Sequence, residues 1–279
     1  MTQSKIECHI KVSQPDQDAV SLLAEQTKLS KQVIKNAMQK GAVWLTRGKQ
    51  TSRLRRAKKA LAVGNELHLY YNAHILAEQV TPAKMLFDEG QYSLWYKPYG
   101  MRCQGSKWSD HTTIDRFVEL NATPQRSAYL IHRLDRAATG LIILGHTKQA
   151  TRDIAKMFET RNLSKHYQVI VNGRFPDDEV TINTDVDNKP ALSRARRLQY
   201  NSELDQSLVQ VKIESGRKHQ IRIHMASLGH SVVGDRLHGD ADETSPDLKL
   251  TSCYFEFICP VSNERKVFEL PEQYRPTFG

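Results

Sequence analysis

The sequence predicts an α+β fold in which a small domain precedes a larger one. The chain has 279 residues, of which 39% are hydrophobic, and this is enough for two separate cores. From about Leu86 onward, short apolar segments of strand length are interrupted by helical patterns at irregular places. Irregular placement favours an α+β domain, because a doubly wound sheet would need strands and helices in regular alternation.

Positive charge is concentrated in one short part of the chain. The net charge is +9, from 40 Lys and Arg against 31 Asp and Glu. Residues 28–59 contain eleven basic side chains and no acidic one, which leaves 29 basic against 31 acidic in the remainder. A solvated surface usually mixes both signs, whereas a segment of one sign attracts a polyanion. We therefore expect residues 28–59 to contact nucleic acid.

The sequence lacks the features of secreted and membrane proteins. The N-terminus has no apolar core of signal-peptide length, and no segment approaches the roughly 20 consecutive apolar residues that a membrane helix needs. The four cysteines have no CxxC spacing, which favours reduced thiols over a zinc site. We expect a cytoplasmic protein that does not associate with a membrane.

The small domain is predicted to contain two helices and two strands. Residues 18–26 have helical periodicity, and Ser30 is an N-cap for a second helix that ends before Gly41. The apolar residues of the second helix share one face, which turns Lys31 and Lys35 outward. The other predicted segments are a strand at 42–46, a basic loop at 47–56 and a closing strand at 66–71.

This order of elements resembles the S4-like RNA-binding domain, a small α/β module of ribosomal proteins and RNA-modifying enzymes. The resemblance covers roughly residues 14–73, and Gly41 and Val43 stand where that family has Gly and Val before a strand. Residues 45–48 depart from the Asn and Gly that often follow in that family. The resemblance implies RNA binding through cations of this domain, for which we select Lys31, Lys35, Arg53, Arg55 and Arg56.

The predicted organisation is residues 1–73 as the S4-like domain, 74–86 as a linker that contains Pro82, and 87–279 as the larger domain. In the larger domain, helices are predicted at 148–158 and 219–228. Its predicted strands are the segments YSLWYKP, GLIILG, KHYQVIV, SLVQVKI and CYFEFIC.

A charged cluster lies directly before one of these strands. His132, Arg133 and Asp135 precede the apolar run 141–144, so they lie on a connection that leads into the core. A carboxylate in such a turn is commonly a cap or a member of a surface ion pair, and position alone favours that interpretation of Asp135. The sequence has no GxSxG elbow, Walker-type loop or GxGxxG motif that would supply another reaction centre.

The segment GRKHQIRIHMASLGH, residues 216–230, combines cations with a predicted helix. His219 and Arg222 are three residues apart and share one helical face, and Arg217 precedes the helix, where free backbone N–H groups suit a phosphate. A metal site built from the histidines is the alternative. It is disfavoured because His219 and His224 fall on different faces and no HExxH pattern is present.

Four ordered motifs resemble those of the RluA-type pseudouridine synthases. They are KPYG at 97–100, HRLD at 132–135 with Gly140-Leu141 after it, the pair Lys165 and Tyr167, and GRxHQIRxH followed by GHxxxGD, which ends at Asp235. The resemblance spans residues 93 to about 258 and implies the fold of that family, with a mixed, mainly antiparallel sheet. It implies conversion of a uridine in structured RNA to pseudouridine after the base is flipped out, without a cofactor or metal.

The resemblance also assigns roles to individual residues. It makes Asp135 the catalytic carboxylate, Arg222 its ionic partner and Tyr167 the residue that stacks on uracil, although strand periodicity alone would equally fit a core tyrosine. It also implies RNA contacts by motif residues, namely His132, Arg133, Lys97, Lys165, Arg217, His219 and Gln220. The chain departs from the family pattern at Ala138-Thr139, at Ser231, and at His238, where the family commonly has Tyr.

We expect a monomer whose partner is RNA, with ribosomal RNA favoured over transfer RNA. Two other functions are compatible with parts of the sequence. The first is a non-catalytic RNA-binding or ribosome-assembly factor on the same fold, against which the intact Asp135, Tyr167 and Arg222 argue. The second is a metal-dependent phosphoesterase that uses the histidines. Activity that a chelator abolishes would favour the phosphoesterase.

Overall fold

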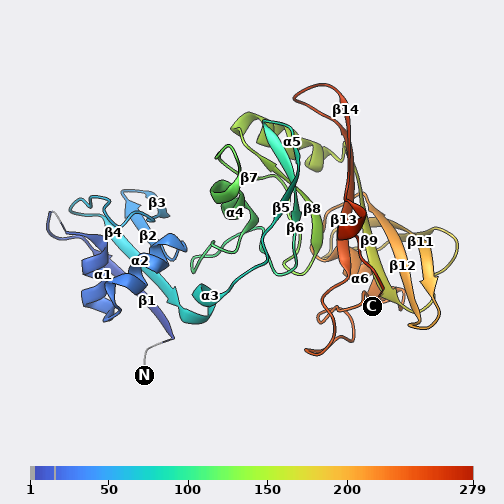
Figure 1. Ribbon diagram of the computed structural model, residues 1–279, viewed down its shortest axis with the longest axis horizontal. Coiled ribbons are helices and arrows are strands. Elements are labelled where there is room, and N and C mark those ends of the chain that lie inside the picture. The colour runs from blue at the N-terminus through green and yellow to red at the C-terminus, as the bar shows by residue number, and fades with distance from the viewer. Residues whose placement is uncertain (1–3, 16, 279) are drawn as a thin grey trace. The chain divides into compact units, whose positions relative to one another are not determined.

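The chain forms two compact units in a computed structural model that describes residues 4–15 and 17–278 (Figure 1). One unit consists of Met1–Val80 together with Gln104–Phe117, and the other of Thr81–Cys103 together with Val118–Gly279. The division differs from the predicted one, because residues 104–117 leave the larger domain and join the N-terminal unit. Within the described residues, no helix is both long and apolar enough to span a membrane.

The N-terminal unit is a four-stranded antiparallel sheet with helices packed on it. The strand order is β1-β4-β2-β3. The strands are β1 (Lys5–Lys11), β2 (Val43–Arg47), β3 (Gln50–Arg53) and β4 (Glu66–Asn72), and the helices are α1 (Ala19–Thr27), α2 (Lys31–Gln39) and the short α3 (Ala73–Ala77).

The two main helices begin where the sequence predicts. The Asp18 side chain accepts a hydrogen bond from the backbone N–H of Ser21, and Ser30 accepts one from Val33, so both helices are capped. Leu23 of α1 and Ile34 of α2 are fully buried and pack in the same core cluster as Leu69 of β4. Burying these side chains against one face of the sheet stabilises the unit.

Two strands of this unit were not predicted. Strand β3 lies in the segment 47–56, for which the sequence predicts a loop. The strand escapes prediction because its residues are polar and it forms an exposed edge of the sheet. In β1 the side chains alternate between exposed and partly buried, a weaker pattern than that of a core strand. The expected linker 74–86 also contains regular structure, since it holds most of α3 and the start of β5 (Lys84–Asp88).

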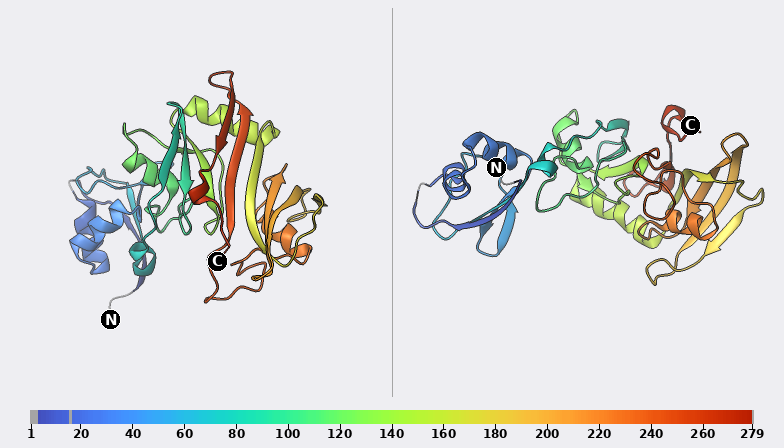
Figure 2. Two further views of the ribbon diagram at one scale, coloured as in Figure 1. Left: turned by 45° about the vertical axis from the view of Figure 1, so that its right-hand side comes forward. Right: turned by 90° about the horizontal axis from the view of Figure 1, so that it is seen from below.

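The C-terminal unit is built on one large mixed sheet, which Figure 2 shows from two further directions. The strand order along its main path is β10-β11-β12-β9-β13-β8-β6-β5, with β14 on β13 and β7 on β8. The strands that follow β5 are β6 (Tyr92–Lys97), β7 (Tyr129–Leu130), β8 (Thr139–Gly145), β9 (Ser164–Asn172), β10 (Val180–Asn183), β11 (Leu192–Asn201), β12 (Gln206–Ile213), β13 (Leu250–Ile258) and β14 (Arg265–Glu269). The predicted α+β class with a mainly antiparallel sheet is confirmed.

Helices of the C-terminal unit pack against this sheet. They are α4 (Ile114–Asn121), which begins in the segment 104–117, α5 (Lys148–Thr160), α6 (Gln220–Ser227) and the 3-10 helix η1 (Glu272–Tyr274). Ile154 and Met157 of α5 share a core cluster with Leu141 and Ile143 of β8 and Phe255 of β13. This apolar core anchors the strands whose ends carry the site.

One parallel contact within the sheet brings two motifs together. Strands β8 and β13 run parallel, with Gly140 opposite Ser252, and Ser252 also pairs with Tyr167 on the other side. Gly140 has a φ of +106°, and a Cβ at this position would overlap the carbonyl oxygen of Ser252. A residue with a side chain would therefore force β8 and β13 apart, and Gly140 allows β8 to pack closely on β13, the strand that separates it from β9.

Candidate active site

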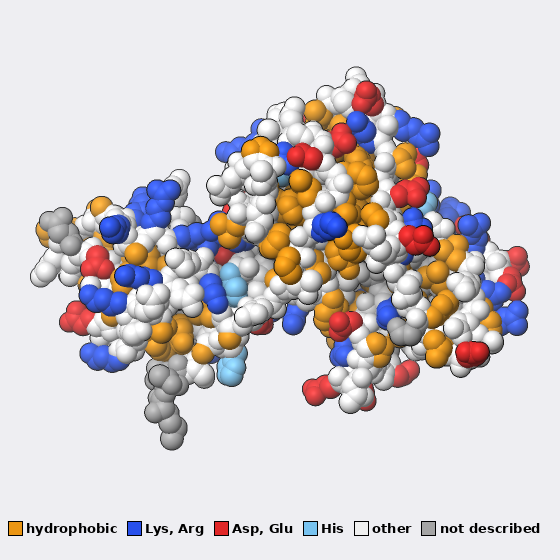
Figure 3. Space-filling model, in the orientation of Figure 1, with side chains coloured by type: hydrophobic (Ala, Val, Ile, Leu, Met, Phe, Trp, Pro, Cys, Tyr) orange, Lys and Arg blue, Asp and Glu red, His pale blue; other side chains and the backbone are white. Residues whose placement is uncertain are grey.

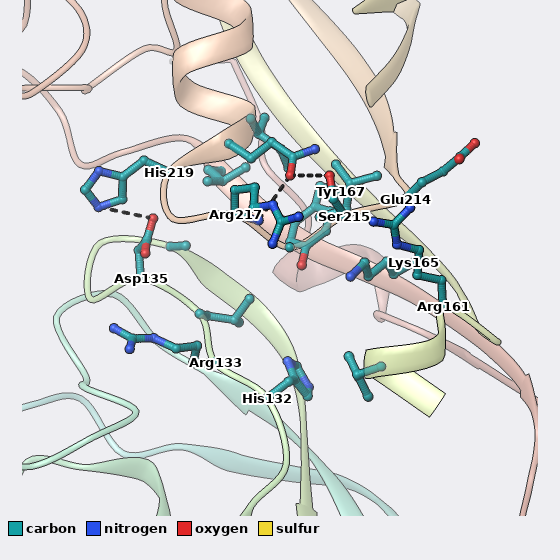
Figure 4. A pocket seen from close by; sticks show the side chains of 18 of the residues that line it. His132, Arg133, Asp135, Arg161, Lys165, Tyr167, Glu214, Ser215, Arg217 and His219 are labelled. Carbon is teal, nitrogen blue, oxygen red and sulfur yellow. Dashed lines mark hydrogen bonds and ion pairs between the residues drawn. The ribbon is translucent and has the colours of Figure 1, made fainter. Parts of the chain in front are cut away.

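A cavity of about 520 Å³ opens in the C-terminal unit at the ends of β8 and β9 and the start of α6. Its walls come from the loop before β8, the last turn of α5, β9 and the loop before α6 (Figure 4). Asp135, Tyr167, His219 and Lys165 all line it, although they are spread over more than 80 positions of the sequence. The fold therefore brings three of the predicted motifs to a single cavity.

Asp135 lies at one side of this cavity with two potential cations beside it. Its carboxylate Oδ2 is 3.7 Å from Nη1 of Arg222 and 3.7 Å from Nε2 of His219. The side chain is 22% exposed, so it is neither on an open surface nor sealed in the core. Its own backbone carbonyl accepts a hydrogen bond from Ala138, which holds the turn between HRLD and β8. Asp135 is therefore a partly buried carboxylate on a fixed turn.

A buried ion pair holds Arg222 in place. Its Nε and Nη2 donate to the two carboxylate oxygens of Asp235 at 2.8 and 2.5 Å, and this bidentate geometry leaves Nη1 directed at Asp135. Burial opposes ionisation of Asp235. The hydrogen bonds from Arg222 and from the backbone N–H groups of His238 and Leu237 outweigh burial and lower the pKa of Asp235 to about 2. Arg222 therefore reaches Asp135 as a fixed cation.

Tyr167 is a buried member of the cavity wall. It lies on β9 between Val211 of β12 and Ser252 of β13, and only 8% of the residue is exposed. Burial raises the pKa of its hydroxyl far above the ordinary value, and the nearby charge of Asp135 adds to the shift. The hydroxyl therefore stays protonated, and the ring offers a flat surface to a ligand in the cavity.

His219 connects Asp135 to a second histidine. It is the N-cap residue of α6 and has a left-handed backbone with φ of 56°, without a side-chain capping bond. Its Nδ1 lies 2.9 Å from Nε2 of His238, and the two rings meet edge to face. Burial lowers the pKa of His219, and this effect outweighs the opposing charge of Asp135. His219 is therefore a neutral imidazole at pH 7.

Cations occupy the part of the cavity away from His219. Lys165 and Arg161 lie in this part together with Glu214, and Arg217 lines the cavity between them and His219 (Figure 4). Only 9% of Lys165 is exposed, and burial lowers the pKa of its ammonium group to about 8. Arg133 also lines the cavity, and the residue is exposed. This positive region offers donors to an anionic group such as a phosphate.

Two of the residues predicted to bind RNA have structural roles instead. Lys97 is fully buried, and its ammonium group donates to the carbonyl oxygens of Pro98, Met101 and Arg136 at 3.1, 2.8 and 3.4 Å. The prediction that Lys97 contacts RNA is wrong, because the lysine ties the KPYG loop to the residue after Asp135. Its motif position gave no sign of this burial.

The second correction concerns Gln220, which is 2% exposed. Its amide oxygen accepts from Ser215 and from the backbone of Arg217, and its amide nitrogen donates to Leu192 and Ser193. With every hydrogen-bonding group of the amide occupied, Gln220 shapes the loop before α6 and is not available to bind RNA.

His132 also serves the framework of the cavity. Its Nε2 accepts a hydrogen bond from the backbone N–H of Ile143, and its ring stacks on Phe158 at a centroid distance of 4.5 Å. Burial lowers the pKa of His132 to about 3, so the ring stays neutral and keeps its acceptor nitrogen. The same side chain therefore links HRLD to β8 and forms part of the cavity wall.

The predicted RNA-binding residues of the N-terminal unit fall into two groups. Arg53 and Arg55 both form ion pairs with Asp110 of the segment 104–117, at 3.0 Å for Nε of Arg53. Their guanidinium groups are therefore engaged within the unit. Lys35 and Arg56 are exposed, and Figure 3 shows Lys and Arg side chains spread over one face of this unit. Lys31 is exposed as well and donates to Ser21.

His219 and His224 of the segment 216–230 do not lie in one site. The imidazole of His224 is buried and hydrogen-bonded to Ser193 and to the carbonyl of Thr184, whereas His219 faces Asp135. Within the described residues, no group of three or more His, Cys, Asp or Glu side chains is arranged to hold a metal ion.

Asp235 and His238 belong to the site, although the sequence alone assigns no role to either of them. Asp235 ends the GHxxxGD motif and lies thirteen residues after its partner Arg222, and a loop separates them. The motif was a signal that Asp235 has a role, but the ion pair could be found only from the structure. His238 stood out in the sequence solely as a departure from the usual Tyr.

Comparison with known proteins identifies the family. The RNA pseudouridylate synthase family matches residues 91–227, which include every motif residue of the cavity. The dual-specificity RNA pseudouridine synthase RluA of Haemophilus influenzae is 30% identical over 159 residues, which cover 51% of this chain and 73% of that protein. The chain belongs to the RNA pseudouridine synthase family. Its larger domain is of the RluA type, as its motifs predicted.

Two further proteins that this chain resembles are also pseudouridine synthases by name. Ribosomal large subunit pseudouridine synthase D of Nitrosomonas europaea is 32% identical over 186 residues, and the chain spans only about half, 52%, of that protein's length. Human RNA Pseudouridylate Synthase Domain Containing 1 is similar in structure, with a TM-score of 0.59 and 21% identity, over 70% of this chain and 86% of that one. The structural similarity confirms the fold.

Proposed function

We propose that this chain converts specific uridines of structured RNA to pseudouridine, with Asp135 as the catalytic carboxylate. The observation that carries the proposal is the position of Asp135, which lines a cavity between the fixed cation Arg222 and the buried ring of Tyr167. Family membership supplies the reaction class, and the geometry supports a role for each of these three residues.

The reaction requires a carboxylate that stays ionised. The N1–C1′ bond of uridine breaks, the base rotates, a C5–C1′ bond forms, and the hydrogen on C5 is lost as N1 gains one. An ionised carboxylate can begin this sequence as a nucleophile or as a base. The Arg222 guanidinium lies 3.7 Å from the Asp135 carboxylate as its ionic partner, and Asp235 keeps that guanidinium oriented.

A uridine must leave its stack to reach this carboxylate. The cavity of about 520 Å³ has room for a nucleotide, and the flat ring of Tyr167 in its wall suits a pyrimidine. The exposed side chain of Arg133, two residues before Asp135, is placed to contact the RNA strand next to the flipped nucleotide. Lys165 and Arg217 offer donors to the phosphate of the flipped nucleotide.

We further propose that the N-terminal unit is an S4-like module that binds the RNA and favours ribosomal RNA over transfer RNA. Its support is the run of eleven cations in residues 28–59 and the exposure of Lys35 and Arg56. The name of the Nitrosomonas relative, a ribosomal large subunit enzyme, agrees with this choice of substrate.

Tritium release tests the catalytic proposal. RNA from cells that lack this protein, labelled with tritium at C5 of uridine, should release tritium with the wild-type chain. Asp135→Asn should release none, because the amide cannot act as nucleophile or base, while RNA binding is retained. A wild-type chain that binds this RNA but releases no tritium would make it a binding factor. Sequencing of pseudouridines in the same cells identifies the target.

Charge reversal tests the role of the N-terminal unit. The triple variant Lys35→Glu, Arg56→Glu and Lys58→Glu should bind RNA more weakly. The slope of log K against log salt should fall in magnitude by about 3, because three phosphate contacts are lost. The single-turnover rate at saturating protein should hardly change. Reversal at the exposed Lys189 of the C-terminal unit is the control. A large loss of chemical rate in the triple variant would refute the division of labour.

A further inference from the structure

A chain of two histidines leads from the loop after α6 to Asp135. His238 Nε2 and His219 Nδ1 are 2.9 Å apart, and His219 Nε2 is 3.7 Å from Asp135 Oδ2. His238 is itself held by its backbone N–H, which donates to Asp235 Oδ1 at 3.0 Å. Both side chains are partly buried, so solvent does not freely replace their mutual contact.

The contact between the two rings restricts where their protons lie. A neutral imidazole has one N–H and one acceptor nitrogen, so two ring nitrogens at 2.9 Å require one donor and one acceptor. If His238 donates, His219 accepts at Nδ1 and has its own proton at Nε2, which faces Asp135. The opposite arrangement would direct a lone pair of His219 at the carboxylate, and this is repulsive. An ionised Asp135 therefore selects the first arrangement.

We propose that His238 is a positioning residue that sets the tautomer of His219, so that His219 presents an N–H to Asp135. This inference rests on the proposed function, because it concerns the carboxylate assigned there. His219 then directs a second N–H toward Asp135, beside the guanidinium of Arg222. Arg222 is a permanent cation held by Asp235, whereas the donor at His219 depends on the ring to which its other nitrogen is bonded.

The surrounding charges keep His219 neutral. The position of its single ring proton therefore decides whether His219 directs an N–H at Asp135. Arg222, Lys218 and His238 face the ring and disfavour the imidazolium, as does burial, whereas Asp135 favours it. The net effect lowers the pKa of His219. In acid, protonation of His219 would replace its acceptor Nδ1 by a second donor and break the contact with His238. The acid limb of the pH–rate profile should therefore report protonation of His219.

Nitrogen NMR gives a readout that does not depend on activity. In the ¹⁵N-histidine-labelled wild-type chain, His219 should show a protonated Nε2 and an unprotonated Nδ1 at pH 7. His238→Phe removes the donor and should give a mixture of tautomers. His238→Gln keeps an amide N–H that can donate without titrating, and it should restore the Nε2–H form. A protonated Nδ1 in the wild type would overturn the proposal.

Single-turnover rates on the tritiated RNA measure the consequence. We expect His238→Phe to lower the rate about tenfold at pH 7 and to move the acid limb to higher pH, with RNA affinity and thermal midpoint unchanged. His238→Gln should recover to within about twofold of wild type. His230→Phe, which removes a histidine bonded to the carbonyl of Asn172 and not to the pair, is the control.

The two proposals fail in distinguishable ways. A wild-type chain that releases no tritium contradicts the proposed function, and the NMR test of the tautomer can still be made. An active wild type in which His238→Phe has an unchanged rate and pH profile, or in which His238→Gln is no better than His238→Phe, overturns the role of His238.

Discussion

Asp235 orders the site although it does not line the cavity. One of its carboxylate oxygens accepts from Nε of Arg222, and the other accepts from Nη2 of Arg222 and from the backbone N–H groups of Leu237 and His238. Arg222 and, through His238, His219 both depend on it. A single buried carboxylate therefore sets the direction of both groups that face Asp135.

This arrangement predicts a large cost for Asp235→Asn. The variant removes the bidentate counter-charge of a guanidinium that is 8% exposed and leaves it only Asp135 at 3.7 Å, and breaking such a buried pair costs about 3 kcal/mol or more. Urea denaturation at pH 7 measures the loss. Asp242→Asn is the control, because Asp242 has a pKa of about 2 as well but lies exposed on the following loop. Equal midpoints for the two variants would contradict the role of Asp235.

The same carboxylate predicts part of the acid sensitivity. The pKa of Asp235 is lowered from 3.8 to about 2 in the folded chain, so its stabilisation is complete above the unfolded value and is lost as the pH falls through the folded value. The contribution is about 2 kcal/mol, lost between about pH 4 and pH 2. Unfolding free energies at several pH values should show a shallower acid dependence in Asp235→Asn than in the wild type.

Among the elements, the parallel contact of β8 with β13 carries the site. It places the turn of Asp135 beside the strand of Tyr167, since Ser252 pairs with both Gly140 and Tyr167. Because Gly140 has no side chain, the backbones of β8 and β13 lie in direct contact there, and no flexible side chain could move aside for a larger residue.

Gly140→Ala should separate these strands. The new methyl group would overlap the backbone of Ser252 and would require a strained φ, so we expect a loss of about 3 kcal/mol together with a large loss of activity. Gly229→Ala is a matched control, because Gly229 also has a positive φ of 78° but no atom would lie within 4 Å of the new methyl. The urea midpoint should fall much further in Gly140→Ala than in Gly229→Ala.

The elements also explain what could be predicted from the sequence. The apolar run of β8 and the capped helix α5 follow from local pattern, as do the motifs that contain Asp135 and Tyr167. Strand β3 could not be predicted this way, because a polar edge strand has no apolar alternation. The burial of Lys97 depends on carbonyl groups from two loops, one of them 39 residues away, and no local pattern records that contact.

At the scale of the whole molecule, the segment Gln104–Phe117 is the main departure from the predicted organisation. It joins the N-terminal unit through the ion pairs of Asp110 with Arg53 and Arg55, and through Lys107, whose ammonium group is 2.9 Å from Glu7. The indole N–H of Trp44 also donates to the carbonyl of Lys107 at 2.9 Å. These partners are far apart in sequence, and their charges gave no sign of pairing.

Removing the N-terminal residues should therefore release this segment. In a chain that starts at residue 81, Lys107 loses both Glu7 and Trp44, so trypsin should cleave after it within minutes. Cleavage there in the full-length chain should be much slower, and mass spectrometry of the fragments distinguishes the two. Equal rates of cleavage would show that the segment does not depend on the N-terminal unit.

The chain passes between its two units three times, at residues 80–81, 103–104 and 117–118. A module joined by a single peptide link can be gained, lost or exchanged between genes by one recombination event. Here such an event would leave fourteen residues of the recipient without their binding surface. An engineered chimera that exchanges the N-terminal unit of this chain therefore has to carry residues 104–117 with it.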